Sequence, residues 1–208
     1  MEEKFISQAS KTDTNVCLNA FLCKMEHRSQ LQNTFGNSKS AFYLKYKNTI
    51  SYGITKNEKQ YPLDRNFGGI YSSGVTIFRS SESSGYALLD LPFQTAIVSV
   101  AAINRPELEK MNGQLCIAKH LIEPTKEKMR TILRIAGKYN HNAIVLSAFG
   151  CGAFCNPPEH IALLFKEVFA EPEFKTRFAL IVFAIISDQN SNRAHNPNGN
   201  FEPFRSVF

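Results

Sequence analysis

Four short apolar runs, separated by other patterns, limit the fold more than any other feature of this sequence. They read GVTIF, AIVSVAA, AIVLSAF and ALIVFAII, at residues 74–78, 96–102, 143–149 and 179–186. Each run is almost continuously hydrophobic, which is typical of strands that are buried on both faces. Because such a sheet must be covered by helices, the sequence predicts an α/β protein with a parallel or mixed sheet.

Two amphipathic helices are predicted between the last three runs. In the first, Pro124 suits the opening turn and Gly137 the end. Its apolar stripe follows the spacing i, i+3, i+4, i+7 and consists of Met129, Ile132, Leu133 and Ala136. The order strand, helix, strand, helix, strand then favours right-handed crossovers and a helix–sheet–helix sandwich.

The second helix has a capping signature. Asn156 is predicted to cap it, Pro157 to occupy the first helical position, and Glu159 to complete a capping box. Its predicted buried stripe consists of Ile161, Leu164, Phe165, Val168 and Phe169.

A run of small residues, SAFGCGAF at 147–154, joins the third strand to this helix. In open α/β sheets, ligands bind at the carboxyl ends of the strands. Gly150 and Gly152 permit positive φ and close approach, so backbone N–H groups can line a concavity beside the helix N-terminus. Because two prolines remove N–H donors from the helix, the amides of 150–154 are predicted to do most of the anion binding.

Two other interpretations of this loop stay open. A G-x-G loop also fits a tight turn in which glycine only sets the backbone geometry, and the loop is neither a P-loop nor a G-x-G-x-x-G fingerprint. Cys151 is a conceivable nucleophile with His160 one turn further on, but small size is the favoured reason for cysteine there. Cys151 and Cys155 have no matching ligand pair, so no metal or other cofactor is expected.

The composition is typical of a globular protein and is compatible with an anionic ligand. The 208 residues are 43% hydrophobic, enough for one globular domain, and contain five cysteines, an odd number that favours reduced thiols in the cytoplasm. No apolar run reaches about 18 residues, and the first residues do not resemble a secretory signal. The net charge of +6 suits an anionic ligand, whereas nucleic acid is not favoured because no basic–aromatic motif is present.

Three ordered blocks resemble the microbial-type poly(ADP-ribose) glycohydrolases. They are GGIYSSGVTIFR (68–79), IVSVAAINRP (97–106) and the segment from EKMRTIL to ALIVFAI (127–185). The likeness covers about residues 62–188 and the closing GNFEPFRSVF (199–208). It implies a macrodomain-like, three-layer α/β/α sandwich with a mixed, largely parallel sheet, formed by a single domain over residues 1–208. Residues 1–60 are its poorly patterned part and 189–208 a loop-like tail.

The resemblance also implies a binding site for ADP-ribose. The loop from Ser147 to Phe154 would embrace the diphosphate, with contributions from Phe149, Gly150, Cys151, Gly152 and Ala153. Phe154 would pack near a ribose, and Asn104 would lie at the cleft. Asp188, just after the last strand, would meet ligand hydroxyls. In the tail, Phe201 or Phe204 would either stack on adenine or anchor the C-terminus.

The sequence departs from this family where its acid should lie. The family uses a glycine triplet and a Gln-Glu-Glu motif whose second glutamate protonates the leaving oxygen, and the corresponding region is about 9–31. Arg28-Ser29 resembles part of that region, but no triplet precedes it, and Leu22 and Cys23 stand at the glutamate positions. Glu26 and Asp13 are the alternative catalytic acids.

The sequence therefore predicts a protein that binds ADP-ribose or a related adenine-nucleotide diphosphate, with an ADP-ribosylated protein as a further partner. The alternative is an ADP-ribosyl or poly(ADP-ribose) glycohydrolase with a rearranged acid.

Overall fold

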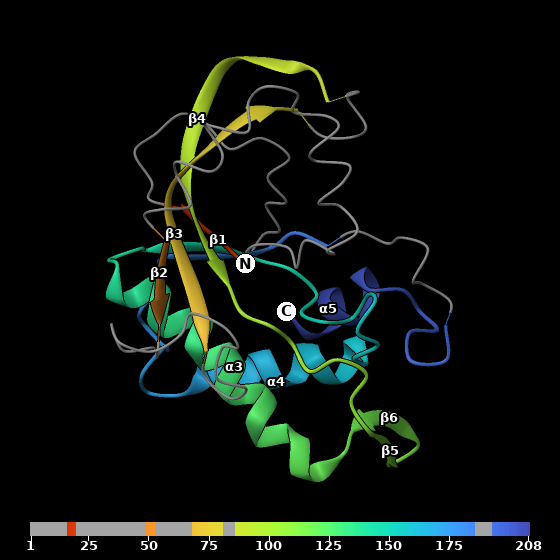
Figure 1. Ribbon diagram of the computed structural model, residues 1–208. Coiled ribbons are helices and arrows are strands. Elements are labelled where there is room, and N and C mark those ends of the chain that lie inside the picture. The colour runs from red at the N-terminus through yellow and green to blue at the C-terminus, as the bar shows by residue number, and fades with distance from the viewer. Residues whose placement is uncertain (1–15, 20–48, 53–67, 81–85, 186–192) are drawn as a thin grey trace.

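A computed structural model describes residues 16–19, 49–52, 68–80, 86–185 and 193–208 (Figure 1). The strands are β1 (Val16–Asn19), β2 (Thr49–Tyr52), β3 (Gly69–Arg79), β4 (Leu88–Ser99), β5 (Leu108–Met111), β6 (Gln114–Ile117), β7 (Ala143–Leu146) and β8 (Leu180–Phe183). The helices are α3 (Lys119–Lys138), α4 (Pro158–Ala170) and α5 (Phe201–Val207).

The main sheet has six strands in the order β2-β3-β4-β1-β7-β8. β4, β1, β7 and β8 run parallel, and the pairs β2–β3 and β3–β4 are antiparallel. The short strand β1 therefore lies between β4 and β7, and the crossover through α3 passes over it. The sheet is mixed, as predicted, and all four predicted runs coincide at least in part with its strands β3, β4, β7 and β8.

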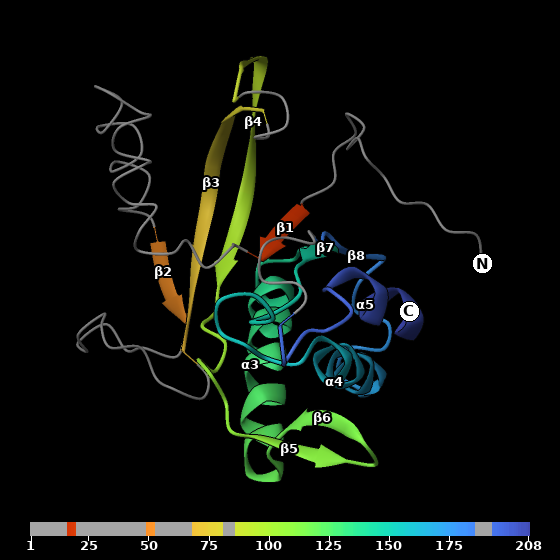
Figure 2. The same ribbon diagram turned by 90° about the vertical axis from the view of Figure 1, so that its right-hand side faces the viewer.

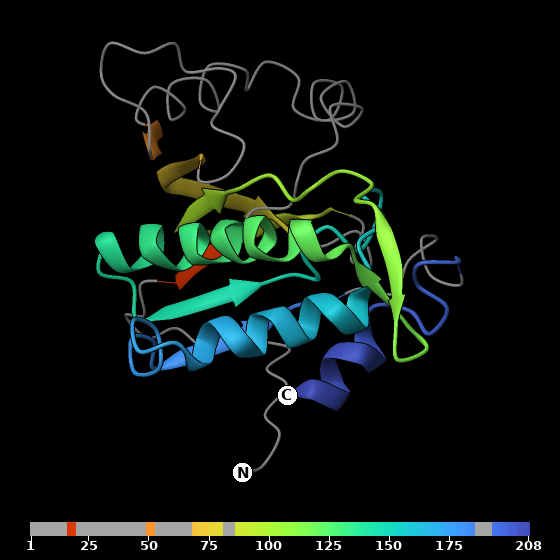
Figure 3. The same cartoon turned by 90° about the horizontal axis from the view of Figure 1, so that it is seen from below.

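Helices α3 and α4 lie together against one face of this sheet, as the views in Figures 1 and 3 agree. The predicted stripe of α3 is confirmed, because Met129, Ile132, Leu133 and Ala136 are fully buried. In α4, Ile161, Leu164, Phe165 and Val168 are buried, and Phe169 packs against them from a half-buried position. This helical face and the sheet enclose the core.

A small hairpin of β5 and β6 stands apart from the main sheet, beyond one end of α3 and α4 (Figure 2). Its turn is Asn112-Gly113, with φ of 52° and 81°. Two positive φ values are what a two-residue type I′ hairpin turn requires, and Asn-Gly is its preferred sequence.

Three local predictions were wrong. Pro124 lies inside α3 because that helix begins at Lys119. Pro157, not Asn156, occupies the N-cap position of α4, and no side chain caps this end. The tail is not wholly a loop, since 201–207 form α5, where Phe204 is buried and packs on Phe183 with ring centroids 5.0 Å apart. Phe204 therefore anchors the C-terminus to the core.

Among the described helices, none is long and apolar enough to cross a membrane.

Candidate functional site

The glycine-rich loop leaves the carboxyl end of β7 and lies against the chain that leaves β4. The N–H of Arg105 donates to the carbonyl of Phe154 at 2.8 Å, and the side-chain amide of Asn156 donates to the carbonyl of Ile103, also at 2.8 Å. β4 and β7 are both parallel to β1, so the two connections emerge at the same edge of the sheet. The structure thus brings the 147–154 loop and the surroundings of Asn104 together.

Asn156 holds the loop from inside. Its side chain is 1% exposed, and Nδ2 lies 2.8–3.2 Å from the carbonyl oxygens of Ile103, Gly150 and Phe154. The N–H of Asn156 also donates to the Gly150 carbonyl at 3.1 Å. A buried amide with these partners fixes both ends of the loop and its neighbour at once. Asn156 is therefore a loop-fixing residue rather than a helix cap.

Gly150 is required at its position for two reasons. Its φ is +75°, a conformation that side-chain-bearing residues rarely adopt. A Cβ there would lie 2.5 Å from Nδ2 of Asn156 and 2.7 Å from Cβ of Ala102. The glycine lets the loop pack directly on Asn156 and on the segment after β4.

The carbonyl groups of the loop are hydrogen-bonded within the protein, whereas most of its N–H groups are not hydrogen-bonded to described residues. The carbonyls of Gly150, Cys151, Gly152 and Phe154 all accept hydrogen bonds from other protein groups. Of the amides from 150 to 154, that of Cys151 donates to the Ala148 carbonyl at 3.0 Å. The other four N–H groups, of Gly150, Gly152, Ala153 and Phe154, have no acceptor within the described part of the chain. Such a loop offers a set of unused donors to an anion.

Two of the residues predicted to bind the ligand, Phe149 and Cys151, have buried side chains. Phe149 is 4% exposed and packs edge-on against Phe165, with ring centroids 6.3 Å apart. Cys151 is fully buried, and its burial, followed by the charge of Glu159, raises the pKa of the thiol well above its usual value. A buried, protonated thiol is a poor nucleophile. The buried thiol thus argues against Cys151 as a nucleophile.

His160 is hydrogen-bonded to another part of the protein and not to Cys151. Its side chain is 6% exposed, and Nδ1 accepts the N–H of Ile117 at 2.9 Å. This bond joins α4 to strand β6 and leaves that nitrogen unavailable as a base for Cys151. The described residues contain no cluster of three or more His, Cys, Asp or Glu that could hold a metal ion.

The remaining predicted residues fall into two groups. Ser147, Gly152, Ala153 and Phe154 are half-buried along the loop, and Asn104 is exposed beside it. Asp13, Glu26 and Asp188 lie outside the described residues.

One residue at the loop had no sequence signal at all. His195, 44 positions further along the chain, places Nε2 3.2 Å from the carbonyl oxygen of Cys151. It belongs to residues 193–200, which precede α5 and lie against the loop. A lone histidine in a polar tail gives no periodicity or spacing from which this contact could be predicted.

No protein-family model matches the sequence, and no curated protein does. Solved structures do match. Poly(ADP-ribose) glycohydrolase from Deinococcus radiodurans in complex with ADP-ribose is 22% identical, with a TM-score of 0.59 over 95% of this chain and 76% of that one. The enzyme from Thermomonospora curvata bound to the inhibitor ADP-HPD is 21% identical, with a TM-score of 0.59 over 94% of this chain and 71% of that one. The chain thus shares the mixed α/β fold of the bacterial poly(ADP-ribose) glycohydrolases.

Proposed function

We propose that this protein binds ADP-ribose, or a related adenine-nucleotide diphosphate, in a macrodomain-type cleft of a single three-layer domain. The observation that carries the proposal is the loop after β7, whose carbonyls accept hydrogen bonds from the protein while four amides have no acceptor within the described residues. Solved structures of the same fold, which hold ADP-ribose or ADP-HPD, support this choice of ligand.

The chemistry of the loop matches a diphosphate. Hydrogen bonds from neutral amides to an anion are stronger than those between neutral groups, and several amides fixed in advance need no reordering on binding. Asn156 and Gly150 supply that fixation. In this proposal Ser147–Phe154 wrap the diphosphate, Phe154 packs near a ribose, and Asn104 and Asp188 meet the ligand from the neighbouring strand ends.

Hydrolysis of an ADP-ribosyl bond is the alternative function. Cleavage of a ribosyl C–O bond passes through an oxocarbenium-like state and needs a carboxyl group to protonate the leaving oxygen. Glu26 or Asp13 would supply that proton. Binding is favoured because the sequence carries no glycine triplet and no paired glutamates in the region where the resemblance places the acid.

Titration calorimetry with ADP-ribose tests the binding proposal. We expect binding with a one-to-one ratio, and a large loss of affinity in Asn156→Ala because the loop loses its internal support. Asn198→Ala is the matched control, since this exposed asparagine has its described side-chain hydrogen bond, of 3.3 Å, with Glu159 and not with a residue of the loop. No binding by the wild-type protein at millimolar ADP-ribose would rule out the proposal.

The alternative is tested by release of ADP-ribose from an ADP-ribosylated protein. The binding proposal predicts no release above the spontaneous rate. Release that disappears in Glu26→Ala or in Asp13→Ala would assign a glycohydrolase and identify its acid. Release that persists in both variants would assign a glycohydrolase whose acid is neither of these residues.

A further inference from the structure

The segment 193–200 contacts the glycine-rich loop through the buried side chain of His195. His195 is 7% exposed, and its Nε2 lies 3.2 Å from the carbonyl oxygen of Cys151. A carbonyl oxygen can only accept, so Nε2 carries the proton and donates. Within the described residues this is the one hydrogen bond that the Cys151 carbonyl accepts.

The hydrogen bond from His195 also determines which way the N–H of Gly152 points. The carbonyl of Cys151 and the N–H of Gly152 belong to the same planar, trans peptide, in which the two groups point in opposite directions. Because His195 fixes the carbonyl, it also fixes the Gly152 N–H on the side away from itself. That N–H has no acceptor within the described residues.

Without this bond, the 151–152 peptide is weakly constrained. Glycine at 152 adds no Cβ barrier to rotation of the peptide plane. The Gly152 carbonyl accepts from the N–H of Cys155 at 3.0 Å, which constrains the next peptide and not this one. His195 is thus the described group that holds the orientation of the Gly152 amide.

His195 is itself held firmly by its own segment. The N–H of Asn196 donates to the Arg193 carbonyl at 2.8 Å, and the Asn196 side chain donates to Oδ1 of Asn200 at 2.6 Å. Asn196 is fully buried and Asn200 nearly so. α5 follows directly and is anchored through Phe204. The position of His195 is therefore fixed by the hydrogen-bonded turn that contains it and by the packed helix α5 that follows.

We infer that His195 is a positioning residue for anion recognition, holding the Gly152 amide toward the diphosphate of the bound nucleotide. This inference rests on the proposed function, because the diphosphate is the ligand of that proposal. His195 acts through the Cys151–Gly152 peptide and makes no contact with the ligand.

Calorimetry with ADP-ribose on three variants tests the inference. His195→Ala removes the donor, and we expect about a tenfold loss of affinity, the usual effect of one hydrogen bond to a charged group. His195→Gln places an amide donor near the position of Nε2 and should restore most of the affinity. Asn198→Ala, in the same segment, should bind as the wild-type protein does. Equal affinity of His195→Ala and wild type would overturn the inference, as would a failure of His195→Gln to recover affinity.

The amide resonance of Gly152 gives a second test without any ligand. In His195→Ala, this proton and nitrogen resonance should shift and its exchange with solvent should change, whereas Asn198→Ala should leave both as in wild type. If His195→Ala does not fold, His195→Asn, whose shorter side chain does not reach the carbonyl, takes its place. An unchanged Gly152 resonance would overturn the inference. Absence of ADP-ribose binding by wild type would reject the proposed function and, with it, the role of His195 in diphosphate recognition, whereas the Gly152 resonance would still report whether His195 orients that amide.

Discussion

Two glycines with nearly the same positive φ allow the cost of that φ to be separated from the cost of close packing. Gly150 has φ +75° and Gly113 has φ +81°. A Cβ at 150 would meet Asn156 and Ala102, whereas a Cβ at 113 has nothing within 4 Å. We expect Gly150→Ala to lower the free energy of unfolding by about 2–4 kcal/mol and to weaken ADP-ribose binding.

Gly113→Ala is the control for that substitution. It should cost about 1 kcal/mol, because only the left-handed conformation is penalised, and it should leave nucleotide affinity unchanged. Denaturant unfolding and calorimetry on both variants measure the difference. Equal losses of stability in the two variants would mean that the contact between Gly150 and Asn156 contributes nothing.

At the scale of elements, a hydrogen bond to His160 links the β5–β6 hairpin to α4, and we expect this link to depend on pH. Burial lowers the pKa of His160 below its ordinary value, with Lys126 acting in the same direction and Glu167 and Glu109 opposing it. A protonated Nδ1 cannot accept the Ile117 N–H. The unfolded chain takes up the proton near pH 6.5, so this contribution to stability is complete above about pH 6.5. It is lost as the pH falls through the lower pKa of the folded state.

We therefore expect wild type to lose more stability than His160→Asn between pH 7.5 and pH 5. The asparagine oxygen stands near the place of Nδ1, accepts the same N–H and does not titrate. Urea unfolding at several pH values gives both curves, and subtracting them removes the titration of all other groups. Parallel curves would show that His160 does not contribute to the pH dependence.

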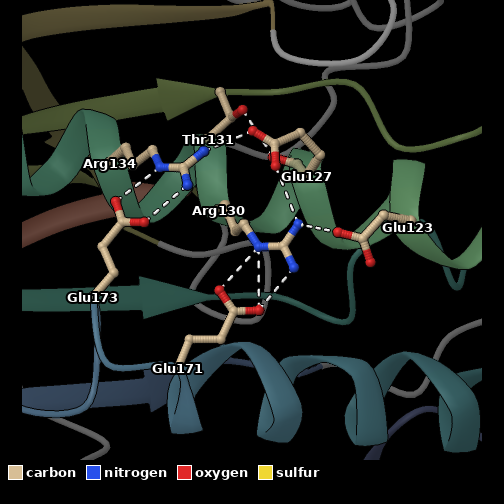
Figure 4. A network of polar contacts seen from close by, with 7 residues as sticks. All are labelled: Glu123, Glu127, Arg130, Thr131, Arg134, Glu171 and Glu173. Carbon is tan, nitrogen blue, oxygen red and sulfur yellow. Dashed lines mark hydrogen bonds and ion pairs between the residues drawn. The ribbon is translucent and has the colours of Figure 1, made fainter.

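A second joint, between α3 and the end of α4, is ionic (Figure 4). The guanidinium of Arg130 binds both carboxylate oxygens of Glu171 at 2.8–3.1 Å and also reaches Glu123 and Glu127, and its side chain is only 14% exposed. Removing Arg130 takes this partner away from Glu123 and Glu171, whereas Glu127 keeps Arg134 at 2.6 Å. We expect Arg130→Met to lower the free energy of unfolding by about 1–3 kcal/mol.

Arg205 provides the comparison for Arg130. It pairs with Glu202 one turn away at 2.7 Å, and both side chains are more than half exposed. Exposed pairs of this kind are usually worth well under 1 kcal/mol, so Arg205→Met should unfold nearly as wild type does. A loss in Arg205→Met as large as in Arg130→Met would contradict the distinction between the two sites.

The strands and helices differ in how well they could be predicted from the sequence. Apolar runs predicted β7 and β8, and an apolar stripe predicted the buried face of α3. Both could be predicted because buried elements show recognisable patterns of apolar residues in the sequence. β1 has only four residues, too few for a pattern, yet it pairs on both sides at the centre of the sheet. The β5–β6 hairpin was not predicted, although its Asn-Gly turn was a usable signal.

At the scale of the whole molecule, the candidate site is assembled by contacts that no local pattern encodes. Asn156 has the sequence of a helix cap, but its amide instead bonds to Ile103, 53 positions earlier. His195 reaches Cys151 across 44 positions. The loop could be predicted because its glycines and its place after a strand are local properties. The residues that support the loop, Asn156 and His195, could not be given this role from the sequence. Their contacts depend on which distant segments the fold brings to the same edge of the sheet.

Since the site joins three distant segments of the chain, a nucleotide bound there should stabilise the molecule as a unit. At a free concentration of 100 times the dissociation constant, a ligand of the folded state adds about 2.7 kcal/mol to the free energy of unfolding. At one fixed concentration, we expect the thermal midpoint to rise most with ADP-ribose, less with ADP and AMP, and least with adenosine. The rise from adenosine through AMP to ADP follows from the proposed function, in which the loop amides of Gly152, Ala153 and Phe154 donate to phosphate oxygens. The further rise with ADP-ribose follows from the contact proposed between Phe154 and a ribose. Equal shifts with adenosine and ADP-ribose would mean that the diphosphate contributes no affinity and that the glycine-rich loop only connects β7 to α4.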